Sequence, residues 1–575
     1  MLDLLIRRAW LVDGTGSERR RADIGLADGR IAAIGDLRGQ PAVREIDASE
    51  RIVCPGFIDL HTHYDAQLFW DPDLTPSSLH GITSVVSGNC GFTVAPLEPG
   101  DDYLARLLSR VEGIPLGALR TGVPWTWRST GEYLAALRGR TAINVGVLVG
   151  HSALRRSVMG AAATERAATA GEIEQMQGLL RAGLRSGALG FSSTRSQTHF
   201  DGEGTPVPSR WATEDEFIAM ATVCAEFDGV SIETSPVAST GILPDDDVEL
   251  MISMSRHGRC PVNWNAMTVT AGELPIVEAN IDAGTRAEAA GGRVVAMTIP
   301  MPVQVRYSFL SGVFLDALPG WDRFMRLPPA ERLDRLADPA ERARLNDSAQ
   351  QPGPRRDQAD WSALTVLEGF SPLSRSLEGR TIGAVAEQQG RDPFDVLSEI
   401  VVADRLRTGL GRIPSEPTAA DWEAKLRVWR DPRAVVGASD AGAHLDVLAI
   451  FNYPTWILQE AVRRHGLLAL EEAVALLTSV PAELYGLHDR GRVNEGARAD
   501  LVLFDEARVG TEALSTVEDL PDGSGRVFAP ATGIDAVMVA GHTVVANGRP
   551  TGVLAGAVFE RGVDTVSAEL QVPRR

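Results

Sequence analysis

Two histidines two residues apart, His61 and His63, close an apolar run and have the spacing of a metal-binding pair. The run from Phe57 to Leu60 predicts a short buried strand, and strand residues two apart point to the same side. Both imidazoles should therefore face one point at the C-terminal end of the strand, where a parallel α/β barrel keeps its active site. Neutral histidine is the commonest metal ligand in proteins. The pair therefore predicts a metal site.

A carboxylate far along the chain, Asp440, has the matching position in a second apolar run that begins at Ala434. The first and last strands of a closed barrel are neighbours, so the separation in sequence does not keep Asp440 from the histidines. An aspartate there can bind the metal. It can also take a proton from an activated water and pass it to a leaving group. Asp440 is therefore predicted to be both a metal ligand and the general base and acid.

The elements that must position these groups follow the alternation typical of repeated βα units, which predicts an α/β fold with a TIM-like (β/α)8 barrel. Candidate barrel strands cover 54–61, 82–88, 143–150, 188–193, 230–234, 261–267, 294–299 and 434–440. The barrel is expected over 56–484. A helical insertion at about 300–432 is expected to form a lid or pocket wall over the active site, or a surface excursion without function.

The two ends of the chain, 1–55 and 485–575, read as short strands separated by turns such as Asp28-Gly29 and Asn547-Gly548. We expect them to fold together into one small β-sandwich domain.

The chain resembles the amidohydrolase superfamily, and more narrowly its N-acyl-D-amino-acid deacylase (D-aminoacylase) branch. The resemblance runs nearly end to end, and the matching segments are 56–63, 80–91, 149–151, 439–444, 478–482 and 495–501. The His-x-His motif marks only the superfamily, whereas Gly-Asn-Cys-Gly at 88–91 is more specific to the deacylase branch. The resemblance implies a barrel framed by a terminal β-sandwich and a metal-dependent hydrolase.

Further candidate residues lie at the ends of the predicted strands. Cys90 follows the second strand between glycines that let the backbone approach a ligand, and a thiolate is a strong zinc ligand. In the branch that the chain resembles, this cysteine binds the metal. His151 and His199 follow the third and fourth strands, where either is expected to bond the substrate carbonyl or support a ligand. Glu233 ends the fifth strand and is expected either to bind the metal or to pair with an arginine such as Arg195.

The chain also departs from that branch. The branch ends its fifth strand in Thr-His-Met-Arg and its sixth in Ser-His-His-Lys, and these histidines complete a zinc site with the cysteine. Here both histidines are missing: Thr234 falls at the first, Ala266 or Met267 at the second, and Thr268 near the lysine. A bridging carbamylated lysine is excluded too, because the only lysine, Lys425, lies outside the predicted strands. One zinc ion rather than two is therefore expected, on His61, His63 and Asp440 with Cys90 or Glu233.

The lysine that helps to hold a substrate carboxylate in that branch is missing as well. Arg195 or Arg306 is expected to replace it, because a guanidinium binds a carboxylate at two points. Asn265 is a third candidate for substrate binding.

Composition restricts the partners. A formal charge of −20 argues against nucleic acid and anionic membranes, and no apolar run approaches the length of a membrane span. The four cysteines lack a disulfide-like spacing and the N-terminus lacks a signal peptide, which favours the cytoplasm. A homo-oligomer is compatible with the sequence.

The expected activity is zinc-dependent hydrolysis of a non-peptide C–N amide bond, with an N-acyl amino acid of D configuration as the first candidate substrate. A cyclic amide, an ester or a carbamate, cleaved at a non-standard metal site, is the second. Two rivals stay open: a degenerate barrel that only binds a small molecule, and a metal-dependent lyase or isomerase that uses the same ligands.

Overall fold

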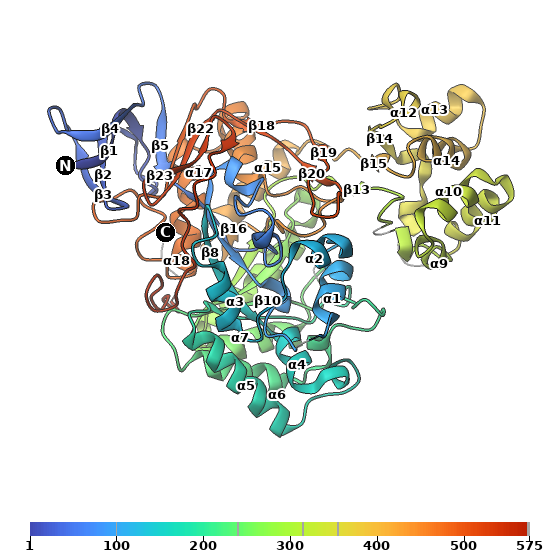
Figure 1. Cartoon of the computed structure of the whole chain (residues 1–575), viewed down its shortest axis with the longest axis horizontal. Coiled ribbons are helices and arrows are strands. Elements are labelled where there is room, and N and C mark those ends of the chain that lie inside the picture. Colours follow the sequence, from blue (N-terminus) through green and yellow to red (C-terminus); the bar gives the residue numbers. More distant parts are fainter. Residues whose placement is uncertain (99, 239–240, 313–314, 353–355, 572–575) are drawn as a thin grey trace.

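A curled sheet of eight parallel strands forms the centre of the molecule (Figure 1). The computed structural model describes residues 1–98, 100–238, 241–312, 315–352 and 356–571. In spatial order the strands are β16 (Ala434–Val436), β12 (Val294–Thr298), β11 (Val262–Met267), β10 (Ser231–Ser235), β9 (Gly190–Thr194), β8 (Asn144–Gly150), β7 (Ile82–Ser87) and β6 (Phe57–Asp59). They are almost wholly buried, as expected for a parallel sheet that is packed on both faces.

The two edges of this sheet meet just beyond β6 and β16. A parallel bridge joins Thr62 to Ala441. The His63 amide donates to the Ala441 carbonyl at 2.7 Å, and the Asp440 amide donates to the His61 carbonyl at 3.1 Å. The predicted (β/α)8 barrel is therefore confirmed, and all eight predicted strands overlap observed ones. The largest differences are at the first and last predictions. The first, 54–61, extends beyond β6 at both ends, and Ile52–Pro55 forms a separate strand, β5, in another sheet. The last, 434–440, continues four residues past the end of β16.

That second sheet joins the two ends of the chain. Its strands from the N-terminal end are β1 (Leu2–Leu11), β2 (Arg20–Ala27), β3 (Arg30–Gly35), β4 (Ala42–Asp47) and β5, and those from the C-terminal end are β17 (Leu501–Phe504), β22 (Ile534–Val539), β23 (His542–Ala546) and β24 (Arg549–Pro550). The antiparallel pairing of β5 with β17 connects the halves, which lie side by side in Figure 1. The predicted β-rich terminal domain is confirmed.

The helices of the barrel begin at recognisable signals. Ser129 and Thr169 each form a capping box with the glutamate three residues later, which satisfies free amides at a helix start. These helices are α1 (Tyr103–Val111), α2 (Leu116–Gly122), α3 (Thr130–Leu137), α4 (His151–Met159), α5 (Ala170–Arg185), α6 (Glu214–Cys224), α7 (Asp245–Gly258), α8 (Leu274–Ala289), α15 (Ala419–Trp429), α16 (Tyr453–Ile457), α17 (Leu470–Leu477) and α18 (Ser479–Leu484). Among the described residues, no helix is both long and apolar enough to cross a bilayer.

The long segment between β12 and α15 forms a lobe with its own apolar core, around Trp321, Trp361 and Phe394. It contains a small sheet of β13 (Arg306–Tyr307), β14 (Thr365–Glu368) and β15 (Gly409–Gly411), with helices α9 (Asp322–Met325), α10 (Pro329–Ala337), α11 (Pro339–Ala349), α12 (Pro372–Arg375), α13 (Ile382–Gln389) and α14 (Pro393–Ala403). The lobe stands beside the barrel in Figure 1. By contrast, α15 packs on the barrel core through Trp422 and Trp429. The domain boundaries that we expected stay predictions.

The lobe borders a cavity of about 520 Å³. Arg306, Phe370 and Arg407 line it from the lobe, Gly113 lines it from the loop after α1, and Thr516 lines it from strand β19 (Ser515–Val517). Strand β19 pairs with β20 (Arg526–Phe528), and β18 (Gly510–Thr511) pairs with β21 (Ala531–Thr532). The cavity lies beside the C-terminal mouth of the barrel, because Gly113 packs against His444, four residues past Asp440.

Candidate metal centre and active site

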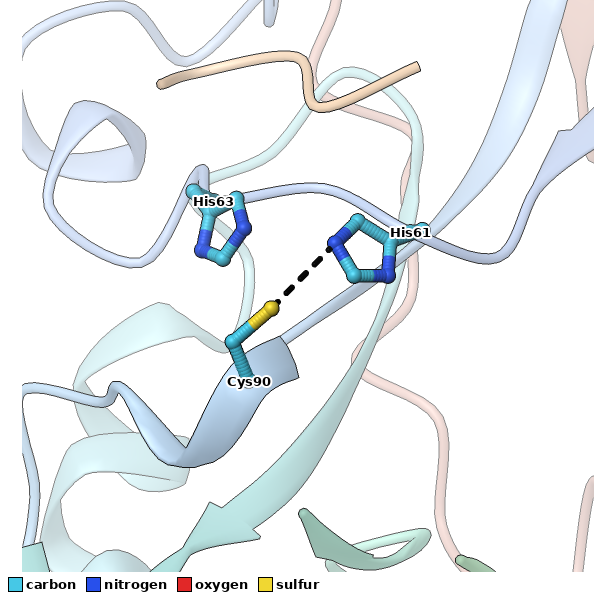
Figure 2. A group of neighbouring side chains, drawn as sticks. All are labelled: His61, His63 and Cys90. Carbon is cyan, nitrogen blue, oxygen red and sulfur yellow. Dashed lines mark hydrogen bonds between the residues drawn. The ribbon is translucent and has the colours of Figure 1, made fainter. Parts of the chain in front are cut away.

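Four side chains converge at the C-terminal mouth of the barrel. His63 Nε2 lies 3.1 Å and His61 Nε2 3.4 Å from the same atom, Asp440 Oδ1. Cys90 Sγ lies 3.6 Å from His61 Nε2. Figure 2 shows His61, His63 and Cys90 pointing toward one another, with the histidines in the segment after β6 and Cys90 in the turn after β7. Imidazole, thiolate and carboxylate are the donors that zinc prefers, and the ligand atoms of His61, His63 and Cys90 all lie within 4.8 Å of one another. The residues fit a divalent ion.

A tight turn brings Cys90 into this cluster. Gly88 has a φ of 83°, and a Cβ there would lie 2.6 Å from the Leu148 carbonyl oxygen, so the turn needs a glycine. The Cys90 amide donates a 2.6 Å hydrogen bond to Glu233 Oε2. Burial alone would raise the pKa of the Cys90 thiol, but the imidazoles of His61 and His63 outweigh it and lower that pKa to about 6. The sulfur is therefore disposed to be a thiolate, the form that binds metal.

Asp440 is ionised in this setting. Burial would raise the pKa of its carboxyl group, but the hydrogen bonds and charges of His61 and His63 outweigh burial and hold the pKa well below its usual range. The side chain keeps 28% of its surface exposed, which is more than either histidine does. His444 Nε2 lies 3.7 Å from the second oxygen, Oδ2. Asp440 therefore faces both the histidine pair and the open mouth.

Two neutral side chains from β10 and β11 complete the wall around the sulfur. Ser235 Oγ lies 3.2 Å and Asn265 Nδ2 3.5 Å from Cys90 Sγ. Asn265 Nδ2 also lies 3.3 Å from His61 Nε2, and its Oδ1 accepts a 3.1 Å hydrogen bond from Ser235. Asn265, which we expected to bind substrate, thus lies against the metal centre. Ser235 and Asn265 are each one residue away from Thr234 and Ala266, which, with Met267 as the alternative to Ala266, stand in the sequence where the missing histidines fall.

Glu112 was not found from the sequence. It lies directly after α1, buried, with Oε1 3.5 Å from His63 Nδ1. Ligand atoms of Glu112, His63 and Asp440 lie within 4.8 Å of one another. The sequence carries little signal for it, because a glutamate at the C-terminal end of a short amphipathic helix is most often a surface residue.

Glu233 is buried in the middle of β10 rather than at its end as we expected, and its two oxygens face other groups than the Nε2 atoms of the histidines. Oε2 accepts from the Cys90 amide, and Oε1 lies 3.8 Å from His61 Nδ1. Arg195, the alternative partner that we considered for it, pairs instead with Asp247 at 2.7 Å. We therefore replace the predicted metal-ligand role of Glu233 with a supporting one.

His151 does not reach the metal centre. Its Nδ1 lies 2.8 Å from Ser193 Oγ, and its Nε2 lies 2.9 Å from Glu216 Oε1. Arg155 donates to both oxygens of the same glutamate, at 2.6 and 2.5 Å. Ser193, His151, Arg155 and Glu216 are all fully buried. With both ring nitrogens held by protein groups, His151 has the contacts of a structural residue.

Glu216→Ala should therefore affect folding rather than chemistry. Removing the carboxylate leaves the Arg155 cation buried without its partner, which is expected to cost about 3 to 5 kcal/mol of unfolding free energy. The bound metal per chain should stay as in the wild type. Urea denaturation and elemental analysis measure the two effects, with Glu214→Ala on the exposed side of α6 as the control. Loss of metal in a folded Glu216→Ala protein would return His151 to the site.

His199 lies nearer the cluster. Its Nδ1 is 2.9 Å from Thr194 Oγ1, and its ring packs edge-on to Phe92 at 5.2 Å. Burial lowers the pKa of His199 to about 3, with the charge of Asp440 acting in the opposite direction. The ring is therefore neutral at pH 7.

The two arginines that we expected to hold a substrate carboxylate are already paired. Arg195 is bound to Asp247 as above. Arg306 donates from Nη1 to Thr516 at 2.7 Å, and its Nη2 lies 2.8 Å from Glu368 Oε2. Arg306 lines the cavity beside the lobe, so of the two only Arg306 lies in a described cavity near the mouth. Their roles in substrate binding stay predictions.

The fold and this site define a class of protein: residues 44–545 match the model of the Amidohydrolase family, and the chain belongs to that family. It is 32% identical to an N-acyl-D-glutamate deacylase of Alcaligenes xylosoxydans xylosoxydans, over 96% of this chain and 95% of that protein. A D-aminoacylase of the same organism is 28% identical over 97% and 98% of the two chains.

Solved structures agree with this assignment. A D-aminoacylase crystal structure matches with a TM-score of 0.65 and 27% identity, covering 98% of this chain and all of the other. An N-acyl-D-glutamate deacylase from Bordetella bronchiseptica, complexed with zinc and a phosphonate mimic of the tetrahedral intermediate, matches with a TM-score of 0.61 and 29% identity, covering 97% and 99%. The resemblance to the deacylase branch is thereby confirmed, because the similarity to these deacylases covers nearly the whole chain.

Proposed function

We propose that this protein is a zinc-dependent deacylase that releases the acyl group of an N-acyl-D-amino acid. One observation carries the proposal: His61, His63, Cys90 and Asp440, from segments far apart in the chain, converge at the catalytic mouth of the barrel. The full-length similarity to proteins named D-amino-acid deacylases supports the substrate class.

A single zinc ion is the proposed cofactor, held by His61, His63, Cys90 and Asp440. When bound, such an ion would supply Lewis acidity and would lower the pKa of a bound water to about 7. One ion is favoured over two, because the side chains that reach Cys90 from β10 and β11, Ser235 and Asn265, are weak neutral ligands. The zinc in the Bordetella relative supports the choice of metal.

Asp440 is the proposed general base and acid. Its ionised carboxylate accepts a proton from the attacking water as the carbon–oxygen bond forms. It then returns that proton to the departing nitrogen as the C–N bond breaks, so the net reaction consumes one water.

His199 is the proposed donor to the carbonyl oxygen. Its Nδ1 is engaged by Thr194, which leaves Nε2 for the substrate. A neutral imidazole that donates from Nε2 stabilises negative charge as it develops on the oxygen. The cavity between lobe and barrel has room for the part of the substrate remote from the scissile bond.

A panel of N-acetyl amino acids of both configurations tests the proposal. We expect the zinc-loaded protein to release acetate and free amino acid in equal amounts, and to prefer the D enantiomers by at least about tenfold in kcat/KM. Coupled assays for acetate and for the amino acid measure this. Turnover without uptake of ¹⁸O from labelled water into acetate would point to a lyase or isomerase instead. Hydrolysis restricted to cyclic amides, esters or carbamates would favour the second substrate class.

A further inference from the structure

We propose that two buried glutamates, Glu112 and Glu233, position the metal-binding imidazoles. Each glutamate faces the Nδ1 atom of one histidine, on the opposite side of the ring from the metal centre. The inference rests on the proposed metal site and extends it to two residues that do not bind the ion themselves. Their role would be to fix which nitrogen of each ring carries the proton and how each ring is oriented.

The same arrangement occurs twice. For His63, Nδ1 lies 3.5 Å from Glu112 Oε1, while Nε2 lies 3.1 Å from Asp440. For His61, Nδ1 lies 3.8 Å from Glu233 Oε1, while Nε2 lies 3.4 Å from Asp440. Figure 2 shows one nitrogen of His61 directed at Cys90 and the other turned away from it. Each ring therefore stands between a carboxylate and the point where the ligand atoms meet.

The proton on Nδ1 of a metal-bound imidazole explains why a carboxylate should lie there. An imidazole that binds a metal through Nε2 keeps its proton on Nδ1, and a buried N–H needs an acceptor. Within the described part of the chain, His63 Nδ1 makes no hydrogen bond, and Glu112 is the carboxylate at ion-pair distance from it. A carboxylate behind a metal-bound histidine fixes its tautomer and makes it a better ligand.

Burial of both glutamates supports the same role. Glu112 is 3% exposed and Glu233 is fully buried. Burying an unpaired carboxylate lowers the stability of the folded state, so each glutamate needs polar partners that offset this cost. Glu233 has a second partner, because its Oε2 accepts from the Cys90 amide at 2.6 Å. Glu233 thus connects His61 to the turn that carries Cys90.

The alternative is that Glu112 binds the ion directly, since its oxygen lies within 4.8 Å of ligand atoms of His63 and Asp440. The two roles of Glu112, as a positioning residue or as a metal ligand, predict different absorption spectra of the cobalt(II) protein. An outer carboxylate changes affinity without changing the number of ligands, whereas an inner one alters the coordination sphere.

The test uses Glu112→Gln and Glu233→Gln in the full-length protein, with Glu460→Gln as a control: Glu460 is also a buried carboxylate, but it pairs with Arg464. Zinc affinity is measured by competition with a chelator, and visible absorption is recorded on the cobalt(II) forms. We expect each of the two variants to bind zinc about 10- to 100-fold more weakly, with cobalt bands of unchanged intensity and thus unchanged ligand number. The control should match the wild type.

Three outcomes would overturn the inference: zinc affinities within about twofold of wild type, a lower melting temperature of the metal-free protein as the only effect, or a changed cobalt band in Glu112→Gln that marks an inner ligand. A wild-type protein that takes up neither zinc nor cobalt would overturn both this inference and the proposed function. A wild type that binds metal but hydrolyses no acyl amino acid would overturn the proposed function alone.

Discussion

Replacing Asp440 with asparagine is expected to lower kcat by about a thousandfold at saturating zinc, while the protein stays folded. Asparagine keeps the shape of the side chain but cannot take up the proton of the attacking water, and general base and acid catalysis is typically worth 10²- to 10⁴-fold. His61, His63 and Cys90 remain to hold the ion, so one zinc per chain should still bind, more weakly. Steady-state kinetics on the best substrate of the panel, with metal analysis on the same sample, measures both effects.

Asp245→Asn is the matched control for this variant, because it makes the same substitution at an exposed carboxylate on α7, where Asp245 pairs with Arg286. It should keep wild-type kinetics. An Asp440→Asn enzyme that retains more than about a tenth of wild-type kcat with zinc bound would rule out Asp440 as the proton carrier.

The double variant His61→Ala, His63→Ala should bind no zinc and show no turnover. Each imidazole donates a nitrogen to the same point near Asp440 Oδ1, and Cys90 with Asp440 alone leaves too few ligands for a tetrahedral site. Elemental analysis after dialysis against zinc gives the stoichiometry. Circular dichroism checks that the barrel has formed, because most of its core lies outside the mouth.

A thermal measurement separates loss of metal from loss of fold in this variant. A ligand that binds only the folded state stabilises it, by about 2.7 kcal/mol at a free concentration of 100 times Kd. The wild type should therefore melt at a higher temperature when zinc is added, and the double variant should not. His257→Ala, His542→Ala, two exposed histidines outside the site, is the control. Catalysis by a zinc-free double variant would favour metal-free chemistry in this barrel.

The centre of the site could be predicted from the sequence because strand geometry is regular. Residues two apart on a strand share a side, and the C-terminal ends of parallel strands meet at one mouth, so His61, His63 and Asp440 follow from local patterns alone. The same regularity placed all eight barrel strands. The backbone hydrogen bonds from Asp440 to His61 and from His63 to Ala441, which join the first and last strands, could not be predicted from the sequence.

The rest of the site depends on helices and loops, whose placement the sequence does not encode locally. Glu112 reaches His63 only because α1 ends against the barrel mouth, and nothing in its neighbourhood marks that contact. His151 sits at a strand end, as a catalytic residue would, yet tertiary packing gives it Glu216 and Arg155 as partners. Arg195 and Arg306 likewise pair with carboxylates distant in sequence, which no spacing rule reveals.

The contact between the segments after β6 and β16, which closes the barrel, has a consequence for metal binding during synthesis of the chain. Its hydrogen bonds join Asp440 to His61 and Ala441 to His63, and Ser439 and His61, which are also hydrogen-bonded, are 378 positions apart in the sequence. Contacts this distant form late, because a long loop must close first. A nascent chain on the ribosome therefore carries three of the four proposed metal ligands, His61, His63 and Cys90, long before the fourth, Asp440, is made. We therefore expect an unfinished or truncated polypeptide to bind the metal more weakly than the complete barrel, because it lacks the carboxylate of Asp440.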